Sequence, residues 1–317
     1  MSNFPRRRAR RLAVIALSAA LVTAGCGAER ADESSAPKTS EKQFPVTVTP
    51  PAGEPLTIEK RPERIVSLSA SNTETLFAVG AGEQVVAVDD QSTYPAEAPK
   101  TKLSGLTPNV EAIADYDPDL VVLSDDADDI VASLKQLKRQ VLLVPAAKTL
   151  DDVYAGIELI GAATGHADEG KDLAARTKGD IEKLASDAPK LKQPLTYYHE
   201  LDTTLYSATS KTFIGQVYGL FGLSNIADPA DKDSGGYPQL SNESILKANP
   251  DLIFLGDTKC CQQSADTVAK RPGWANLKAV KDGNVVALDD DLASRWGPRV
   301  VDLARSVSDA VDKATSS

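Results

Sequence analysis

Two adjacent side chains near the end of the chain could together bind a large ligand. Arg295 is followed directly by Trp296, and a guanidinium beside an indole can hold a delocalised or anionic molecule by hydrogen bonds and stacking. Trp296 has a second interpretation, in which it packs the last helix onto its sheet. Other polar and aromatic side chains occur in loops after predicted strands. The predicted ligand-binding set is Ser71, Asn72, Gln91, Tyr94, Tyr237, Asp291, Arg295 and Trp296.

The sequence contains no pattern typical of an active site. It has no G-x-S-x-G, H-E-x-x-H, Walker or dinucleotide-binding glycine motif, and no nucleophile paired with a base at a familiar spacing. We therefore expect no enzymatic activity, no cofactor and no metal site built from protein side chains. The alternative, an enzyme, requires turnover of a substrate for which the sequence names no catalytic group.

Three cysteines and two histidines limit the redox and metal chemistry of the chain. Cys260 and Cys261 are adjacent, and in an oxidising compartment they would form a vicinal disulfide or remain as two unpaired thiols. There is no Cys-x-x-Cys spacing for a metal. His199 shares a strand face with Tyr197, so it would be an iron ligand if that face meets the cleft, and otherwise a satisfied histidine at a strand end.

Residues 110–123 align without a gap on residues 242–255, and this repeat indicates two similar lobes. Each copy contains a glutamate at the start of a short helix (Glu111 and Glu243), a turn at Pro-Asp, and an apolar run of strand length. One repeat at an offset of 132 residues is too widely spaced for a solenoid.

The elements that position these side chains alternate between strands and helices. Strands are predicted near 64–68, 84–88, 120–123, 141–144, 195–201, 252–255 and 285–288, and helices near 76–79, 128–137, 150–163, 168–185, 213–221 and 298–314. This alternation predicts parallel pairing, with ligands at the carboxyl ends of the strands. The predicted fold class is α/β, with an N-terminal lobe over 60–165, a single long linking helix over 166–190 and a C-terminal lobe over 191–317.

The N-terminal segment is predicted to direct export. Residues 1–25 are typical of a signal peptide, because five arginines precede an apolar run over 12–22 that is too short to span a membrane. Thr23-Ala24-Gly25-Cys26 resembles a lipobox, in which the cysteine is lipidated, although Thr23 replaces the more usual Leu or Val. The alternative is ordinary cleavage and a soluble secreted protein, and both Sec and twin-arginine export remain open. Residues 26–59 are predicted to be the lipidated Cys26 and a flexible tether.

Charge excludes one class of partner. Removing the signal removes five arginines and leaves 30 basic and 45 acidic side chains, a net charge of about −15. Binding of nucleic acid or anionic lipid by general electrostatics is therefore not expected. The acidity is explained by solubility, although a cationic ligand would also gain from it.

Several motifs together resemble the periplasmic-type binding proteins of bacterial ABC importers for ferric siderophores, cobalamin and haem. The motifs are Arg64-Ile65-Val66-Ser67-Leu68, Asn72-Thr73-Glu74-Thr75-Leu76, Tyr94-Pro95, the two Glu-containing Pro-Asp-Leu repeats, and Trp274 after Arg271-Pro272-Gly273. The resemblance extends over about 59–314. It implies two α/β lobes joined by a single long helix, a ligand cleft between the lobes, and little hinge closure.

The resemblance also implies a role for the repeated glutamates. In that family a glutamate on each lobe docks into arginine pockets of the permease dimer, and the matching positions are Glu111 and Glu243. Each glutamate also lies in the first turn of a predicted helix, where it favours the helix dipole, and both interpretations can hold together.

The expected function is that of a monomeric, lipid-anchored protein on the extracytoplasmic face of the cell membrane. It would capture a ferric siderophore or related Fe(III) chelate and deliver it to an ABC permease. Haem and cobalamin are alternatives: Tyr94, Tyr237 or His199 would serve haem as an axial ligand, whereas only two tryptophans, and Gly105 where an aromatic is expected, disfavour cobalamin. Another alternative is a non-transport envelope lipoprotein that senses or scaffolds.

Overall fold

The computed structural model describes residues 43–232 and 235–316, and two parallel sheets form its framework. The first sheet has the strand order β4-β3-β5-β6 and the second the order β10-β9-β7-β8. Read from β8, the second order matches the first, strand for strand. The strands are β3 (Ile65–Leu68), β4 (Val85–Val88), β5 (Leu120–Leu123), β6 (Gln140–Leu143), β7 (Thr196–Glu200), β8 (Ser224–Asn225), β9 (Leu252–Leu255) and β10 (Val285–Ala287).

The sequence repeat has the same structure in both lobes. Helix α2 (Val110–Ala114) precedes β5 and helix α7 (Asn242–Ala248) precedes β9. Asp117 and Asn249, at matching positions, both take a left-handed backbone conformation, with φ of 45° and 48°. The aspartates of the Pro-Asp turns also match. Asp119 accepts a hydrogen bond of 3.0 Å from the Arg64 N–H, and Asp251 accepts one of 2.8 Å from the Thr196 N–H. Each turn therefore aligns its strand with the neighbouring one.

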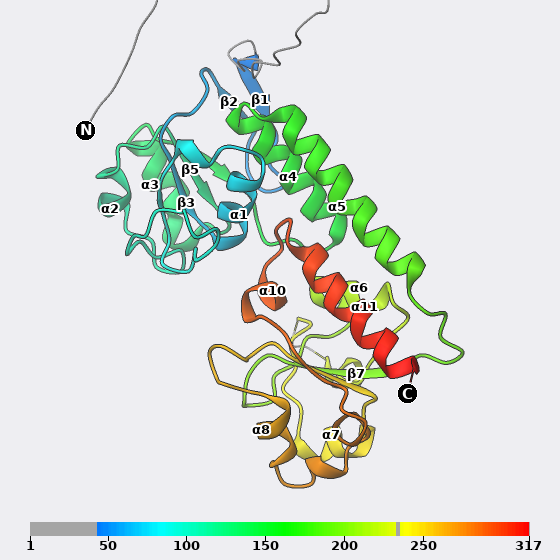
Figure 1. Ribbon diagram of the computed structural model, residues 1–317. Helices are drawn as coiled ribbons and strands as arrows, with labels where there is room; N and C mark the ends of the chain where they lie inside the picture. Colours follow the sequence, from blue (N-terminus) through cyan, green and yellow to red (C-terminus); the bar gives the residue numbers. More distant parts are fainter. Residues whose placement is uncertain (1–42, 233–234, 317) are drawn as a thin grey trace, which may run out of the picture. The chain divides into compact units, whose positions relative to one another are not determined.

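One long helix carries the chain from the first lobe to the second, and two other helices pack against it. Helix α5 (Ala167–Asp187) is the predicted long helix, and it packs against α4 (Leu150–Thr164) and α11 (Val300–Ser316) (Figure 1). Helices α4 and α5 cross closely at Gly161, where an added Cβ would lie 2.9 Å from the Cα of Gly170. Gly161 and Gly170 therefore permit the two helices to pack closely.

One apolar core runs through both lobes. It contains Ile65 and Leu76 of the first lobe, Tyr197 and Leu252 of the second, and Ile181 of α5. Each lobe also has a smaller apolar cluster of its own, around Val121 in the first lobe and around Trp274 in the second. The shared core makes the lobes parts of one folded body.

The predicted tether is wrong in its last part. Residues Val46–Val48 (β1) and Leu56–Ile58 (β2) form an antiparallel hairpin, in which Val48 and Ile58 are buried in the shared core. These strands are three residues long and lie among Pro, Thr and Gly, so their composition resembles that of a linker. The predicted signal peptide and Cys26 lie outside the described residues.

The remaining elements are short. The α-helices are α1 (Ala70–Ala78), α3 (Ile130–Gln136), α6 (Phe213–Gly219), α8 (Ala265–Ala269), α9 (Lys278–Lys281) and α10 (Asp290–Ser294), and the 3₁₀ turns are Gly82–Gln84, Ala127–Asp129, Asp228–Ala230 and Trp274–Asn276. Within 43–232 and 235–316, no helix has both the length and the apolar character that crossing a membrane requires.

Candidate functional site

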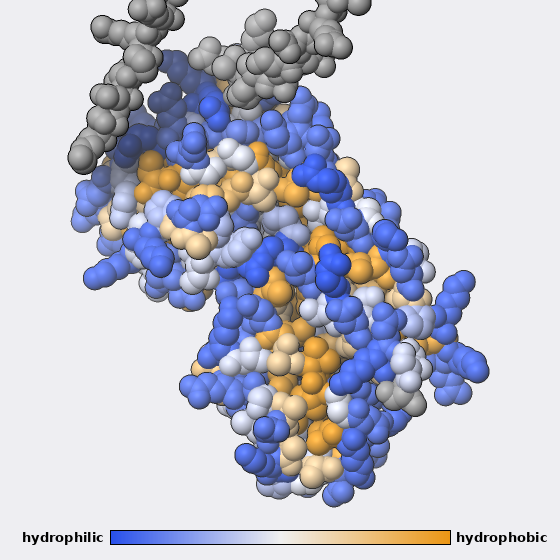
Figure 2. Space-filling view, in the orientation of Figure 1, coloured by the Kyte–Doolittle hydropathy of each residue, from blue (hydrophilic) through white to orange (hydrophobic). Residues whose placement is uncertain are grey.

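A cavity of about 620 Å³ lies where the two lobes meet. The first lobe contributes residues that follow β3, β4 and β5, and the second contributes α10 and the residues after it. Figure 2 shows mainly hydrophilic residues where the lobes meet. The lining consists of Leu68, Ser69, Ala70, Ser71, Asp89, Gln91, Gly105, Leu106, Ser124, Asp125, Ala127, Asp291, Ser294, Arg295 and Trp296. Its position at the carboxyl ends of parallel strands is where α/β proteins bind ligands.

A second, larger cavity of about 710 Å³ has no contribution from the C-terminal lobe. It is lined by α4, the start of α5, and the segments around Ala52 and Pro145. Its walls include the loop after β6 but no residue of the second lobe, whereas the interlobe cavity draws on both lobes, so we take the interlobe cavity as the candidate site.

The structure brings five of the eight predicted ligand-binding residues to the interlobe cavity. They are Ser71, Gln91, Asp291, Arg295 and Trp296. Tyr94 and Tyr237 are outside the lining and roughly half exposed, and the Tyr94 ring lies under the Arg299 guanidinium at 4.2 Å. The prediction that these tyrosines contact a ligand remains a prediction.

Asn72 does not line the cavity, and the prediction that it binds the ligand remains a prediction. Its side chain is buried, and its amide donates to the carbonyls of Leu123 and Val144 at 3.4 and 3.1 Å. Asn72 therefore ties α1 to the ends of β5 and β6. Ser71, one residue earlier on the helix, faces the cavity instead.

Arg295 links the two lobes. Its Nη1 donates to Glu74 at 2.7 Å, and its Nη2 donates to the Gln91 carbonyl at 2.9 Å and to Asp291 at 2.8 Å. Arg299 also pairs with Glu74, at 3.1 Å. Glu74 is buried, and burial raises the pKa of its carboxyl, although both arginines lower it. Sequence reasoning quoted Glu74 only as part of a motif and missed this contact.

Asp291 has three partners around the cavity. It accepts from Arg295, from Lys259 at 3.0 Å, and from the Thr93 hydroxyl at 3.4 Å. Lys259 also pairs with Asp289 at 2.7 Å. The carboxylates of Asp289 and Asp291 are therefore paired with cations of the second lobe, and Arg295 extends this pairing to Glu74 in the first lobe.

Trp296 lies between the shared core and the cavity. It is half-buried against the shared core and also lines the cavity. Its backbone N–H donates to the Ser71 hydroxyl at 3.2 Å, whereas its buried indole N–H has no acceptor among the described residues. The indole is therefore placed to report on the cavity.

Asp89 and Gly105 form part of the cavity wall in the first lobe. Asp89 accepts from the Ser92 hydroxyl at 2.5 Å, and burial raises the pKa of its carboxyl. A Cβ on Gly105 would lie 2.7 Å from both Asp89 Oδ2 and the Leu68 carbonyl oxygen. An aromatic side chain at position 105 would therefore require this wall to move.

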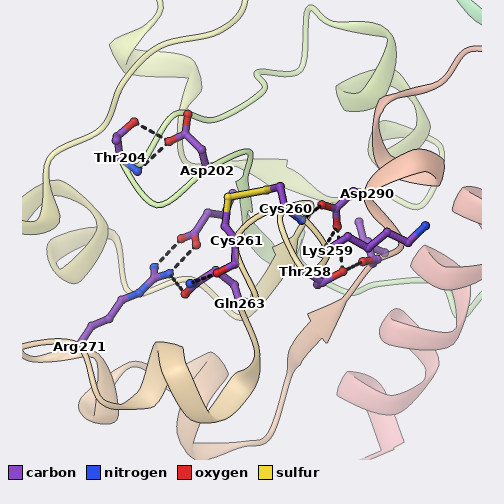
Figure 3. Close-up of a disulfide and its surroundings, with 11 residues drawn as sticks. Asp202, Thr204, Thr258, Lys259, Cys260, Cys261, Gln263, Arg271 and Asp290 are labelled. Carbon is purple, nitrogen blue, oxygen red and sulfur yellow. Dashed lines mark hydrogen bonds and ion pairs between the residues drawn. A yellow bond between two sulfur atoms is a disulfide. The ribbon is translucent and has the colours of Figure 1, made fainter. Parts of the chain in front are cut away.

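Cys260 and Cys261 are joined by a disulfide in the loop after β9 (Figure 3). Asp290 holds one side of this loop in place, because its carboxylate accepts hydrogen bonds of 2.9 Å from the backbone N–H groups of Lys259 and Cys260. On the other side, Gln263 accepts from Arg271 at 2.7 Å. The loop thus connects α10 with a buried charge cluster.

That buried cluster consists of Glu200, Asp257 and Arg271, and sequence reasoning missed it. Arg271 binds Glu200 with two hydrogen bonds of 2.6 Å each. Both carboxylate oxygens of the buried Asp257 lack a hydrogen-bond partner among the described residues. Burial is the main cause and the neighbouring Glu200 carboxylate the second, and together they raise the pKa of Asp257 to about 7. A proton on Asp257 would supply a donor toward Glu200.

His199 is not available as a metal ligand in the cavity. It is fully buried, its Nδ1 lies 2.8 Å from the Tyr218 hydroxyl, and burial lowers its pKa to about 4. No group of three His, Cys, Asp or Glu side chains in the described part of the chain is arranged to hold a metal ion.

Glu111 and Glu243 are both exposed in the first turns of α2 and α7. Their matching positions follow from the repeat, and neither contributes to the cavity lining. Their carboxylates are accessible to a partner.

Comparison with known proteins identifies a family model and close relatives. The model described as "Periplasmic binding protein" matches residues 65–292. The ABC transporter substrate-binding lipoprotein YvrC of Bacillus subtilis strain 168, itself described as uncharacterized, is 32% identical over 304 residues, which cover 93% of this chain and 94% of YvrC. A cobalamin-binding protein of Halobacterium salinarum is 30% identical over 320 residues, covering 98% of this chain and 86% of that protein.

A solved structure has the same fold. A Staphylococcus epidermidis protein, described as a possible iron-binding (periplasmic solute-binding) protein, aligns with a TM-score of 0.67 and 29% identity. The alignment covers 80% of this chain and 99% of that one.

Proposed function

The chain belongs to the periplasmic binding protein family, and we propose that it captures a metal chelate outside the cell membrane and delivers it to an ABC permease. The interlobe cavity carries this proposal, because it lies at the strand ends of the first sheet and is completed by α10 and the residues after it in the second lobe. The protein would bind and release its ligand without chemical turnover.

The ligand we favour is a chelate whose metal is already fully coordinated. The described cavity lining contains no histidine, tyrosine or cysteine, and its aspartates are not part of any group of three side chains arranged to hold a metal ion, so the protein would recognise the outside of the chelate. A ferric siderophore fits this requirement. A corrinoid is the second candidate, favoured by the cobalamin-binding relative. Haem is less favoured, because Tyr94 and Tyr237 lie outside the lining and His199 is buried.

Delivery would depend on Glu111 and Glu243. Both carboxylates are exposed on matching helices, so one arginine pocket on each half of a permease dimer could pair with each of them. We further propose that lipidation of Cys26 anchors the protein, as a monomer, on the outer face of the cell membrane. Mass spectrometry of the protein from its host would detect the acyl groups.

Tryptophan fluorescence provides the direct test. Trp296 lines the cavity, whereas Trp274 is buried in the second lobe and donates to Asn242 at 2.5 Å. Titration with ferric siderophores, cyanocobalamin and haemin should quench Trp296 with submicromolar saturation by one class. Trp296→Phe should remove most of the response, and Trp274→Phe is the matched control that should retain it. Saturable binding of none of these chelates would contradict the proposed function.

A further inference from the structure

The charged groups that line the interlobe cavity are mainly acidic. Three carboxylates, from Asp89, Asp125 and Asp291, face a single guanidinium, from Arg295. Asp125 is exposed, whereas Asp89 is buried behind Gly105. An approaching chelate therefore meets more negative than positive charge among the described lining residues.

The one cation of the lining is already paired. The Arg295 side chain is 10% exposed and makes ion pairs with Glu74 and Asp291. Two nearby cations are also compensated, since Lys259 pairs with Asp289 and Asp291 and Arg299 pairs with Glu74. An anionic chelate would thus have to displace existing ion pairs to gain a counter-charge.

Other groups of the wall add hydrogen-bond acceptors. Gly105 lacks a side chain, so the Leu68 carbonyl and the Asp89 carboxylate both lie close beneath the surface of the wall. Asp125 uses one oxygen to accept the Asp126 N–H at 2.9 Å and retains its second oxygen for another donor. A wall with these acceptors matches a ligand that supplies N–H groups.

We propose that the chelate bound here presents N–H donors, as amides or an ammonium group, and carries no peripheral carboxylate or catecholate anions. This inference rests on the proposed function and deepens it. Two sources share the chemistry: a corrinoid whose side chains are amides, and a hydroxamate siderophore with amide and ammonium groups.

Isothermal titration of the purified protein at low and physiological salt tests this charge selection. The donor-bearing probes are cyanocobalamin and ferrioxamine B, and the anionic probes are a ferric tricatecholate, ferric citrate and haemin. One donor-bearing probe should bind at least tenfold more tightly than every anionic probe. Tightest binding of an anionic probe would overturn the charge inference and leave the proposed function standing. Binding of no probe would overturn both.

A charge reversal localises the effect. Asp125→Lys adds a cation to the lining at an exposed position, and it should weaken binding of the preferred donor-bearing probe at least tenfold. Glu97→Lys makes the same change at an exposed position of the same lobe outside the lining and should leave binding unchanged. Equal affinities of the two variants would overturn the inference.

Discussion

The ion pair between Glu74 and Arg295 should respond asymmetrically to removal of either partner. Arg295→Gln leaves Glu74, whose side chain is 1% exposed, with Arg299 as its remaining counter-charge at 3.1 Å. Removing one partner of a buried pair typically costs 3–5 kcal/mol. Because Arg299 remains, we expect a loss of about 3 kcal/mol in the free energy of unfolding.

Glu74→Gln should cost less. Burial raises the pKa of Glu74 even though both arginines oppose it, so the folded state disfavours the charged form of this side chain. Arg295 retains Asp291 and the Gln91 carbonyl after the change, and glutamine keeps one acceptor oxygen. We expect a loss of about 1 kcal/mol, and about 2 kcal/mol for the double variant, which is less than the sum of the single losses.

Urea unfolding followed by circular dichroism measures these values, because the core shared by both lobes favours one cooperative transition. Arg176→Gln and Glu182→Gln, at exposed positions of α5, are matched controls that should leave the unfolding midpoint unchanged. A Glu74→Gln loss larger than that of Arg295→Gln would refute the reasoning, as would losses that simply add.

Three further predictions concern other parts of the molecule. Replacing Cys260 and Cys261 together by serine should change the free energy of unfolding by about 1 kcal/mol or less, because the cross-link closes a very short loop, and alkylation without reductant should leave both cysteines unlabelled. Asp257 has an ordinary pKa of 3.8 and a folded-state pKa of about 7, so its contribution to stability is present below pH 4 and lost as the pH rises to 7. Urea unfolding at pH 5 and pH 8 should show this loss, on the order of 2 kcal/mol, in the native protein and not in Asp257→Asn. Reversing both Glu111 and Glu243 to lysine should abolish chelate uptake through the permease while ligand affinity is retained, whereas unchanged uptake would favour a sensing or scaffolding lipoprotein.

The fold was predictable because its signals are local. Apolar runs predicted every strand of both sheets except β8, which has only two residues and no such run. The Pro-Asp repeat identified two turns that the structure shows to be equivalent through Asp119 and Asp251. The β1–β2 hairpin was missed because Val48 and Ile58 are isolated apolar residues in a linker-like composition, and they are buried only through distant partners.

The candidate site was predictable only in part, because its chemistry depends on contacts between distant residues. Ser71 and Gln91 follow strands in the sequence, and both lie at the cavity as that position predicted. The same reasoning could not distinguish Ser71 from Asn72, because the next residue on a helix points in a different direction. Arg295 and Glu74 are separated by 221 positions, so sequence spacing carried no sign of their pairing.

Two separate kinds of contact hold the lobes together, and they account for the expected limited closure. Helix α5 packs against α4 and α11 within a core that both lobes share, and Arg295 joins the lobes at the cavity itself. A large hinge motion would have to break apolar packing and buried ion pairs at once, although each alone would resist it. Arg295 and Asp291 line the cavity, and Arg295 also pairs with Glu74 behind it. A ligand that competes for Arg295 would therefore loosen the lobes, whereas one that leaves these ion pairs intact would bind to a preformed site.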